Sequence, residues 1–127
     1  MISVDTNVLV RYVTADDPVQ SRRAADLLGG ADGVYVPPTV LLEMEWVLRA
    51  VYGLERSAVL TAFRQVLGLP SVHIDRPALI ALTLERYERG FDFADALHLA
   101  GAGNATPLYT FDKRFARVAA REGVAAL

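Results

Sequence analysis

The feature that most constrains the fold is the alternation of short apolar strands with helical stretches along the whole chain. The strands are predicted at residues 1–4, 33–36, 72–74, 107–110 and 124–127. Helical patterns fill the segments between them. Strands separated by helices pair in parallel through right-handed crossovers, and the helices then cover both faces of the sheet. The sequence therefore predicts an α/β fold with a mainly parallel central sheet flanked by helices.

Helix signals place the helical segments along the chain. Asp17 before Pro18 predicts a helix start, because an N-cap followed by proline suits the first turn. That helix is expected to end at Gly29-Gly30. Asp75 and Asp92 are predicted to cap two later helices. The predicted helices run from about 7 to 12, 17–30, 39–52, 57–67, 75–89, 92–102 and 113–122.

Length and composition predict one packed domain over residues 1–127. The chain is 53% hydrophobic, which is enough to build a core, and it contains no cysteine, which excludes disulfides and thiolate metal sites. No apolar run approaches the ~20 residues that span a bilayer, and the first residues lack the basic region of a signal peptide. We expect a soluble, cytoplasmic protein without membrane contact. The net charge of −2 does not itself indicate nucleic acid.

Two aspartates follow predicted strands. Asp5 comes after the first strand, and Asp112 comes after the strand at 107–110. In parallel sheets, sites form at the carboxyl ends of strands where strand order reverses, so both carboxylates are candidates for one crevice. For Asp5 the alternative is helix capping, with Thr6 or Asn7 sharing that role, and the sequence alone does not decide between the two.

The helix at 39–52 carries two glutamates. On a helical wheel Glu45 has Arg49 four residues later, in the favourable order for an ion pair on a polar face. Glu43 falls near Trp46, Val47 and Ala50, so it is predicted on an apolar face without a local cation. Burying an unpaired carboxylate is costly, and a bound metal would compensate. The alternative is a long side chain that reaches solvent.

Asp92 and Asp95 lie within one turn at the start of the helix at 92–102. Asp92 suits the cap, and Asp95 is the candidate ligand, although a favourable interaction with the helix dipole is a sufficient structural reason for it. His98, one turn later, is interpreted as a partly buried polar residue. Several carboxylates in one crevice repel each other unless a cation lies among them. Hard oxygen ligands select Mg²⁺ or Mn²⁺.

Taken together, the acidic residues and their neighbours resemble the PIN-domain family. The resemblance rests on Asp5-Thr6-Asn7 after the first strand, Glu43 in a helix with Trp46-Val47-Leu48, Asp92 to His98, and Thr110-Phe111-Asp112-Lys113. It covers the whole chain, and a free-standing domain of this length is similar to the VapC-type toxins of that family.

The resemblance implies a Rossmann-like fold and an endoribonuclease that uses Mg²⁺, with Mn²⁺ as a substitute. It assigns the acidic metal site to Asp5, Glu43, Asp95 and Asp112. Either Asp92 or Asp95 could supply the helical ligand, and we choose Asp95 because Asp92 suits the cap. The resemblance also implies that four neighbouring residues support the ligands: Thr6, Asn7, Asp92 and Thr110. The implied partners are an RNA substrate, a VapB-type antitoxin and a second copy of the chain in a homodimer.

Positive charge next to the site supplies candidate RNA contacts. Lys113, Arg114 and Arg117 follow Asp112 closely, and Arg11 lies in the helix after Asp5. Arginine suits bidentate contacts to phosphate. A solvated helix face or a protein interface explains the same residues equally well.

Two other functions are weighed against the nuclease. A phosphatase of the haloacid dehalogenase type would use Asp5 as nucleophile, but it needs a second aspartate two residues later, where this chain has Asn7. It also needs a lysine before a late pair of acidic residues, and no lysine precedes Lys113. A PIN-like module that only binds RNA or protein would be favoured by a degenerate acidic cluster, and here all four acids are present. No P-loop, dinucleotide-binding or serine-hydrolase motif occurs.

Overall fold

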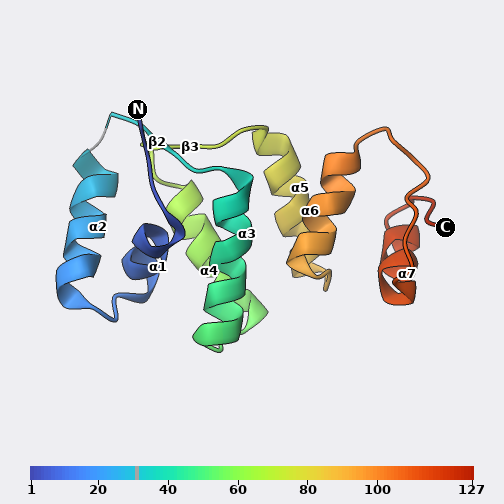
Figure 1. The fold of residues 1–127 in the computed structure, drawn as a ribbon, viewed down its shortest axis with the longest axis horizontal. Coiled ribbons are helices and arrows are strands. Elements are labelled where there is room, and N and C mark those ends of the chain that lie inside the picture. Colours follow the sequence, from blue (N-terminus) through green and yellow to red (C-terminus); the bar gives the residue numbers. More distant parts are fainter. Residues whose placement is uncertain (31) are drawn as a thin grey trace. The chain divides into compact units, whose positions relative to one another are not determined.

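The computed structural model describes residues 1–30 and 32–127. It contains two compact units, Met1–Asp75 and Arg76–Leu127, and each is described here by itself. Figure 1 follows the chain through its helices and strands. The prediction of a single domain over residues 1–127 is not tested by this division and stays a prediction.

The first unit is built around a small parallel sheet, as the sequence predicts. Its strands are β1 (Ile2–Ser3), β2 (Val34–Tyr35) and β3 (Val72–His73). Ile2 pairs with Val34, and Val34 pairs with Val72, both in parallel register. The strands lie in chain order β1-β2-β3, so the reversal of strand order that we expected beside the acidic residues is not found among these three.

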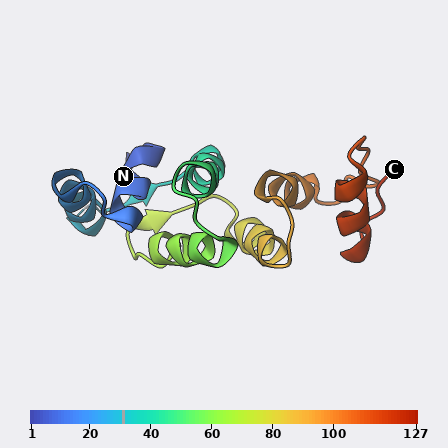
Figure 2. The same cartoon turned by 90° about the horizontal axis from the view of Figure 1, so that it is seen from below.

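The helices of the first unit pack against one another around a fully buried core. They are α1 (Thr6–Thr14), α2 (Pro18–Gly30), α3 (Pro38–Trp46), its π-helical continuation η1 (Val47–Val51), and α4 (Arg56–Leu67). Helix α1 contacts α2, α3 and α4, and Figure 2 shows α3 and α4 on opposite sides of the strands. Leu9, Met44 and Phe63 have no exposed surface. The predicted cap is confirmed, because the Gln20 amide donates to Asp17 Oδ1 at 3.0 Å.

The second unit contains α5 (Pro77–Glu88), α6 (Phe93–Ala102) and α7 (Lys113–Arg121). Helices α5 and α6 lie side by side (Figure 1), and the Tyr87 and Phe93 rings meet edge to face with centroids 5.6 Å apart. A separate apolar cluster joins α6 to α7 through Leu99, Phe115 and Ala119. The N-terminal ends of α6 and α7 are thereby held within one small core.

The two predicted C-terminal strands are wrong as strands. Residues 107–110 and 124–127 form only an isolated parallel bridge between Leu108 and Ala126. Their backbones do bond to each other, with Leu108 donating to Ala125 at 2.9 Å and Thr110 donating to Leu127 at 2.8 Å. Pro107 has no amide to donate, and these few bonds do not extend into a regular ladder. The carboxylate of Asp112 therefore follows an extended segment rather than a strand.

The predicted cap at Asp75 is also wrong. Its carboxylate accepts a hydrogen bond from the Tyr35 hydroxyl at 2.6 Å instead. Helix α5 begins at Pro77, after Arg76 in a left-handed conformation with φ of 50°, and no side chain caps it. Proline at the first helical position requires no amide bond, so this helix can begin without a capping aspartate.

In the part of the chain that the structure describes, no helix combines the length and the apolar character needed to cross a bilayer.

Candidate functional site

The acidic cavity of the second unit begins at the start of α6. Asp92 caps this helix, and its Oδ1 accepts a hydrogen bond from the Asp95 backbone amide at 3.0 Å, as predicted. Asp95 lies in the first helical turn and is half-buried, while Asp92 is exposed. Because one side chain holds the backbone of the other, the two carboxylates are fixed at the same helix end.

Asp112 reaches the same cavity from α7. It is the N-cap of that helix, and its Oδ1 accepts from the Phe115 amide at 3.0 Å. Its own amide donates to the Thr110 hydroxyl at 3.0 Å. Buried Phe115 anchors the first turn of α7 in the apolar cluster. Thr110 therefore holds the backbone of Asp112, while the supporting role at a metal site that the resemblance implies for it stays a prediction.

These carboxylates line one cavity of about 320 Å³. Its walls are Gly90, Phe91, Asp92, Asp95, Asp112, Arg114, Phe115 and Val118. The pKa of Asp95 is raised above its ordinary value, mainly because burial disfavours its charge, and further because Asp92 and Asp112 repel it. His98 and Arg114 act in the opposite direction and do not cancel the shift. The site thus concentrates negative charge around a partly buried acid.

The donor chemistry of this cavity fits a hard divalent cation. Asp92 and Asp112 use Oδ1 for helix capping, and no hydrogen bond within the second unit engages their other carboxylate oxygens. Carboxylate oxygens are the ligands that Mg²⁺ and Mn²⁺ prefer. Among the residues described, however, no three acidic or histidine side chains already form a cluster that could hold a metal ion. The fit of this cavity to a divalent cation therefore rests on its carboxylate oxygens and on the repulsion between the carboxylates, which a cation would relieve.

Asp5 and Glu43 belong to the first unit, so the structure describes the four predicted ligands as two pairs, one in each unit. Asp5 is exposed and caps α1, with its Oδ1 accepting from the Thr6 amide at 2.8 Å. Thr6 is buried, whereas Asn7 is exposed and lines a different cavity. Capping at Asp5 is thereby confirmed, and its other oxygen has no hydrogen-bond donor among the described residues of the first unit.

The predicted environments of the two glutamates are reversed. Glu45 is the buried one, at 3% exposure, and its Oε2 accepts from Arg49 Nε at 2.9 Å. Glu43 is exposed. The buried stripe runs through Leu41, Met44 and Leu48 at helical spacing, and Glu45 lies within it. The expectation that Glu43 occupies an apolar face was wrong. Its assignment as a metal ligand stays a prediction.

The predicted RNA-contacting residues differ in how free their charges are. Arg11 is engaged, because its guanidinium donates to Asp16 at 3.0 Å and to the Tyr52 hydroxyl at 2.8 Å. Arg114 faces the acidic cavity and donates weakly to the Gly90 carbonyl at 3.4 Å. Lys113 and Arg117 are exposed. Lys113 and Arg117 therefore fit a phosphate-contacting role better than Arg11 does.

A charged network in the second unit was missed at the sequence level. Glu122 accepts hydrogen bonds from Arg89 and, at 3.3 Å, from Arg86, and these contacts lower its pKa, with Arg89 contributing most. Arg86 is 8% exposed. The spacing of Arg86, on α5, and Arg89, directly after it, could have suggested a shared partner, but nothing local to Glu122 identifies it as that partner.

Comparison with known proteins adds the family. The PIN domain profile matches residues 2–121, which is nearly the whole chain. The chain belongs to the PIN domain family. PIN domains are generally nucleases that use divalent metal ions, and the parallel sheet with flanking helices agrees with their α/β fold. No curated protein matches the chain at a significant level.

Proposed function

We propose that this PIN domain is a Mg²⁺- or Mn²⁺-dependent endoribonuclease and that its cleavage site includes the acidic cavity of α6 and α7. The observation that carries the proposal is the half-buried Asp95, whose pKa is raised beside Asp92 and Asp112. Perturbed carboxyl groups that line a cavity mark functional sites more often than structural ones. A stably paired structural aspartate would show the opposite shift.

In this proposal the metal ligands are those that the family resemblance assigns, namely Asp5, Glu43, Asp95 and Asp112. A bound cation of this kind lowers the pKa of a water molecule and neutralises phosphate charge. Asp92 and Thr110 hold the backbones of the two ligands through the bonds described above. Exposed Lys113 and Arg117 attract the RNA backbone next to the acidic cavity. Asp5, Asp95 and Asp112 thus lie at helix starts, and Asp5 and Asp112 each use one carboxylate oxygen for capping.

The test is metal removal. The chelated protein should leave a mixed total RNA intact, and adding Mg²⁺ or Mn²⁺ in excess of the chelator should start cleavage. Asp5→Asn should abolish cleavage without unfolding the protein, whereas Asp26→Asn should cleave like the parent. Asp26 is a suitable control because it is exposed on α2 and lies outside the acidic cavity. Cleavage that continues at full rate in chelator would refute the proposal.

The absence of a preformed three-ligand cluster among the described residues favours one alternative, a PIN domain that binds RNA without cleaving it. Such a module would retain RNA on a filter in the presence of Mn²⁺ and leave its length unchanged. Metal-dependent shortening of the RNA excludes this alternative.

For the biological role, we propose the toxin of a VapBC-type pair, with a small antitoxin and a homodimer as its assemblies. The support is the sequence resemblance together with membership of the PIN domain family. Expression of the chain alone should slow growth, and co-expression of a small protein encoded beside it should restore growth. Unimpaired growth together with demonstrated cleavage would refute the toxin role and leave the nuclease standing.

A further inference from the structure

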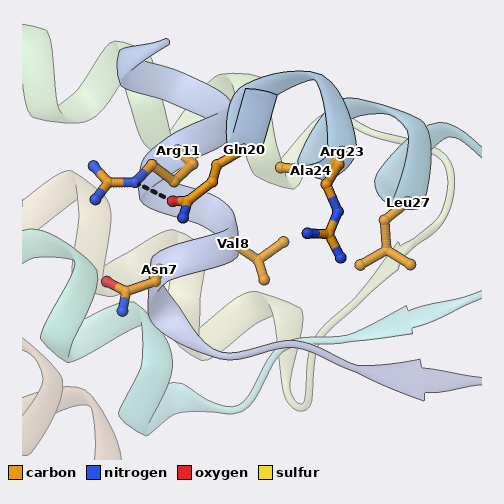
Figure 3. Close-up of a pocket in the computed structure, with 7 residues that line it drawn as sticks. All are labelled: Asn7, Val8, Arg11, Gln20, Arg23, Ala24 and Leu27. Atoms are coloured by element: carbon orange, nitrogen blue, oxygen red, sulfur yellow. Dashed lines mark hydrogen bonds between the residues drawn. The ribbon is translucent and has the colours of Figure 1, made fainter. Parts of the chain in front are cut away.

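A second cavity lies entirely within the first unit, between α1 and α2 (Figure 3). Its volume is about 330 Å³, within the range of small-ligand pockets. Its lining residues are Asn7, Val8, Arg11, Gln20, Arg23, Ala24 and Leu27. Val8, Ala24 and Leu27 form an apolar wall, and the other four side chains are polar or cationic. None of the four proposed metal ligands lines this cavity.

The only charged side chains in this lining are two arginines, and they differ in their partners. Arg11 is neutralised by Asp16, as described above. Arg23 forms no hydrogen bond or ion pair with any residue that the structure describes, and Figure 3 shows its guanidinium extending between Val8 and Leu27. A cation without a partner beside an apolar wall suits a ligand that has both an anionic group and a flat apolar surface.

The amides of the cavity can supply the remaining recognition. Arg11 Nε donates to Gln20 Oε1 at 2.8 Å, which fixes that amide and leaves its NH₂ group to donate elsewhere. Asn7 lines the other end of the cavity (Figure 3), two residues after Asp5 in the first turn of α1. A ligand that occupies this cavity would therefore extend toward the proposed ligand Asp5.

We propose that this cavity, defined by Arg23, Gln20, Asn7 and the apolar wall, is a nucleotide subsite that positions single-stranded RNA for cleavage. An unpaired base packs on Val8 and Leu27, the two amides hydrogen-bond its edge, and Arg23 contacts a phosphate. This assignment rests on the proposed nuclease function, because an RNA substrate gives the cavity its occupant.

The lining favours a nucleotide over a protein segment. A docked amphipathic helix inserts a row of apolar anchors at helical spacing and needs an extended apolar groove. Here the apolar wall consists of three side chains, and the rest of the lining is two amides and two guanidinium groups. Donors and acceptors close to a small apolar wall match one base with its phosphate more closely than they match a helix face.

The test compares Arg23→Gln with Arg22→Gln. Arg22 is an exposed neighbour on α2 that does not line the cavity, so its substitution removes the same charge without touching the subsite. Binding of a short fluorescein-labelled single-stranded RNA is measured by anisotropy in chelator, where no cleavage occurs. Arg23→Gln should weaken binding about tenfold, as expected for one charge-assisted hydrogen bond. It should also reduce the salt slope by about 0.7.

Arg22→Gln should change the affinity less than twofold. Equal affinities of Arg23→Gln and the parent would overturn the subsite, and a protein occupant would then be the next candidate. Equal losses in both variants would overturn it as well, because they would indicate general attraction to α2. As an independent check, uridine and adenosine monophosphates should shift the side-chain amide resonances of Asn7 and Gln20 in the unmodified protein. Unchanged resonances would contradict the proposed contacts with the base.

The two proposals can fail separately. If the parent cleaves RNA with metal but Arg23→Gln binds RNA normally, the subsite is refuted and the nuclease is not. If the parent never cleaves RNA but binds it through Arg23, the nuclease is refuted and the cavity is an RNA-binding site.

Discussion

Glu45 and Glu43 lie two residues apart in the same helix, and the structure predicts opposite consequences for neutralising each. Glu45 is buried and ion-paired with Arg49, whereas Glu43 is exposed. We expect Glu45→Gln to destabilise the fold and Glu43→Gln to leave stability unchanged. If Glu43 is a metal ligand, Glu43→Gln should instead reduce metal-dependent cleavage.

The size of the Glu45 effect follows from the exposure of its partner. The Glu45 side chain is 4% exposed, but that of Arg49 is 49% exposed. Losing a hydrogen bond to a charged group costs about 1.5–3 kcal/mol. Since Arg49 can turn to water and glutamine still offers a neutral acceptor, the expected loss is about 1–2 kcal/mol. Glu43→Gln, at a solvated position, should change the free energy of unfolding by less than about 0.5 kcal/mol.

Urea denaturation of the two variants measures this difference directly. Trp46, the only tryptophan in the chain, adjoins Glu45 and is 54% exposed, so its fluorescence reports unfolding of this helix. The loss at Glu45 should also lower the melting temperature by about 4 °C for each kcal/mol. If Glu43→Gln were the more destabilised variant, the placement of the two side chains would be wrong.

Two further predictions concern pH. Because the Asp95 pKa is raised, the folded metal-free protein binds the Asp95 proton more tightly than the unfolded chain does. The stability that this proton contributes is therefore fully present below the ordinary pKa of 3.8 and is lost as pH rises through the raised pKa. Asp95→Asn should remove this decline in melting scans at successive pH values in chelator, and an unchanged decline would contradict the assignment. The lowered pKa of Glu122 has the opposite sign, so its contribution is present above the ordinary value of 4.5 and is lost as pH falls. Glu122→Gln should lower the free energy of unfolding by about 2 kcal/mol at neutral pH, since it leaves buried Arg86 without its carboxylate. In this variant, the part of the fall in unfolding free energy with acidification that comes from Glu122 should be missing.

The sequence predicted those parts of the fold that depend on local signals. The caps at Asp17 and Asp92 are read from a capping side chain followed by helix-forming residues, and both are present. The parallel pairing of β1, β2 and β3 follows from the alternation of strands and helices. The caps are encoded within a few residues, and the parallel pairing follows from the pattern repeated along the chain.

Features that depend on the phase of a helix or on distant residues were not predictable in this way. The wheel that placed Glu43 on an apolar face gave weight to Trp46 and Ala50, which are exposed. The partner of Arg86 is 36 residues away, at Glu122. Likewise, the cavity at Arg23 arises from the packing of α1 on α2, and no sequence motif predicts it.

The most direct test of the proposed nuclease is the initial rate of RNA cleavage by Asp95→Asn in saturating Mn²⁺, measured beside Asp26→Asn. Both substitutions remove one negative charge, but only Asp95 lines the acidic cavity. We predict that Asp95→Asn is folded and loses cleavage by at least about a hundredfold, which is the upper end of the loss when only a partner of a metal ligand is removed, while Asp26→Asn keeps the parent rate. Parent-like cleavage by Asp95→Asn would contradict the assignment of this carboxylate to the metal site.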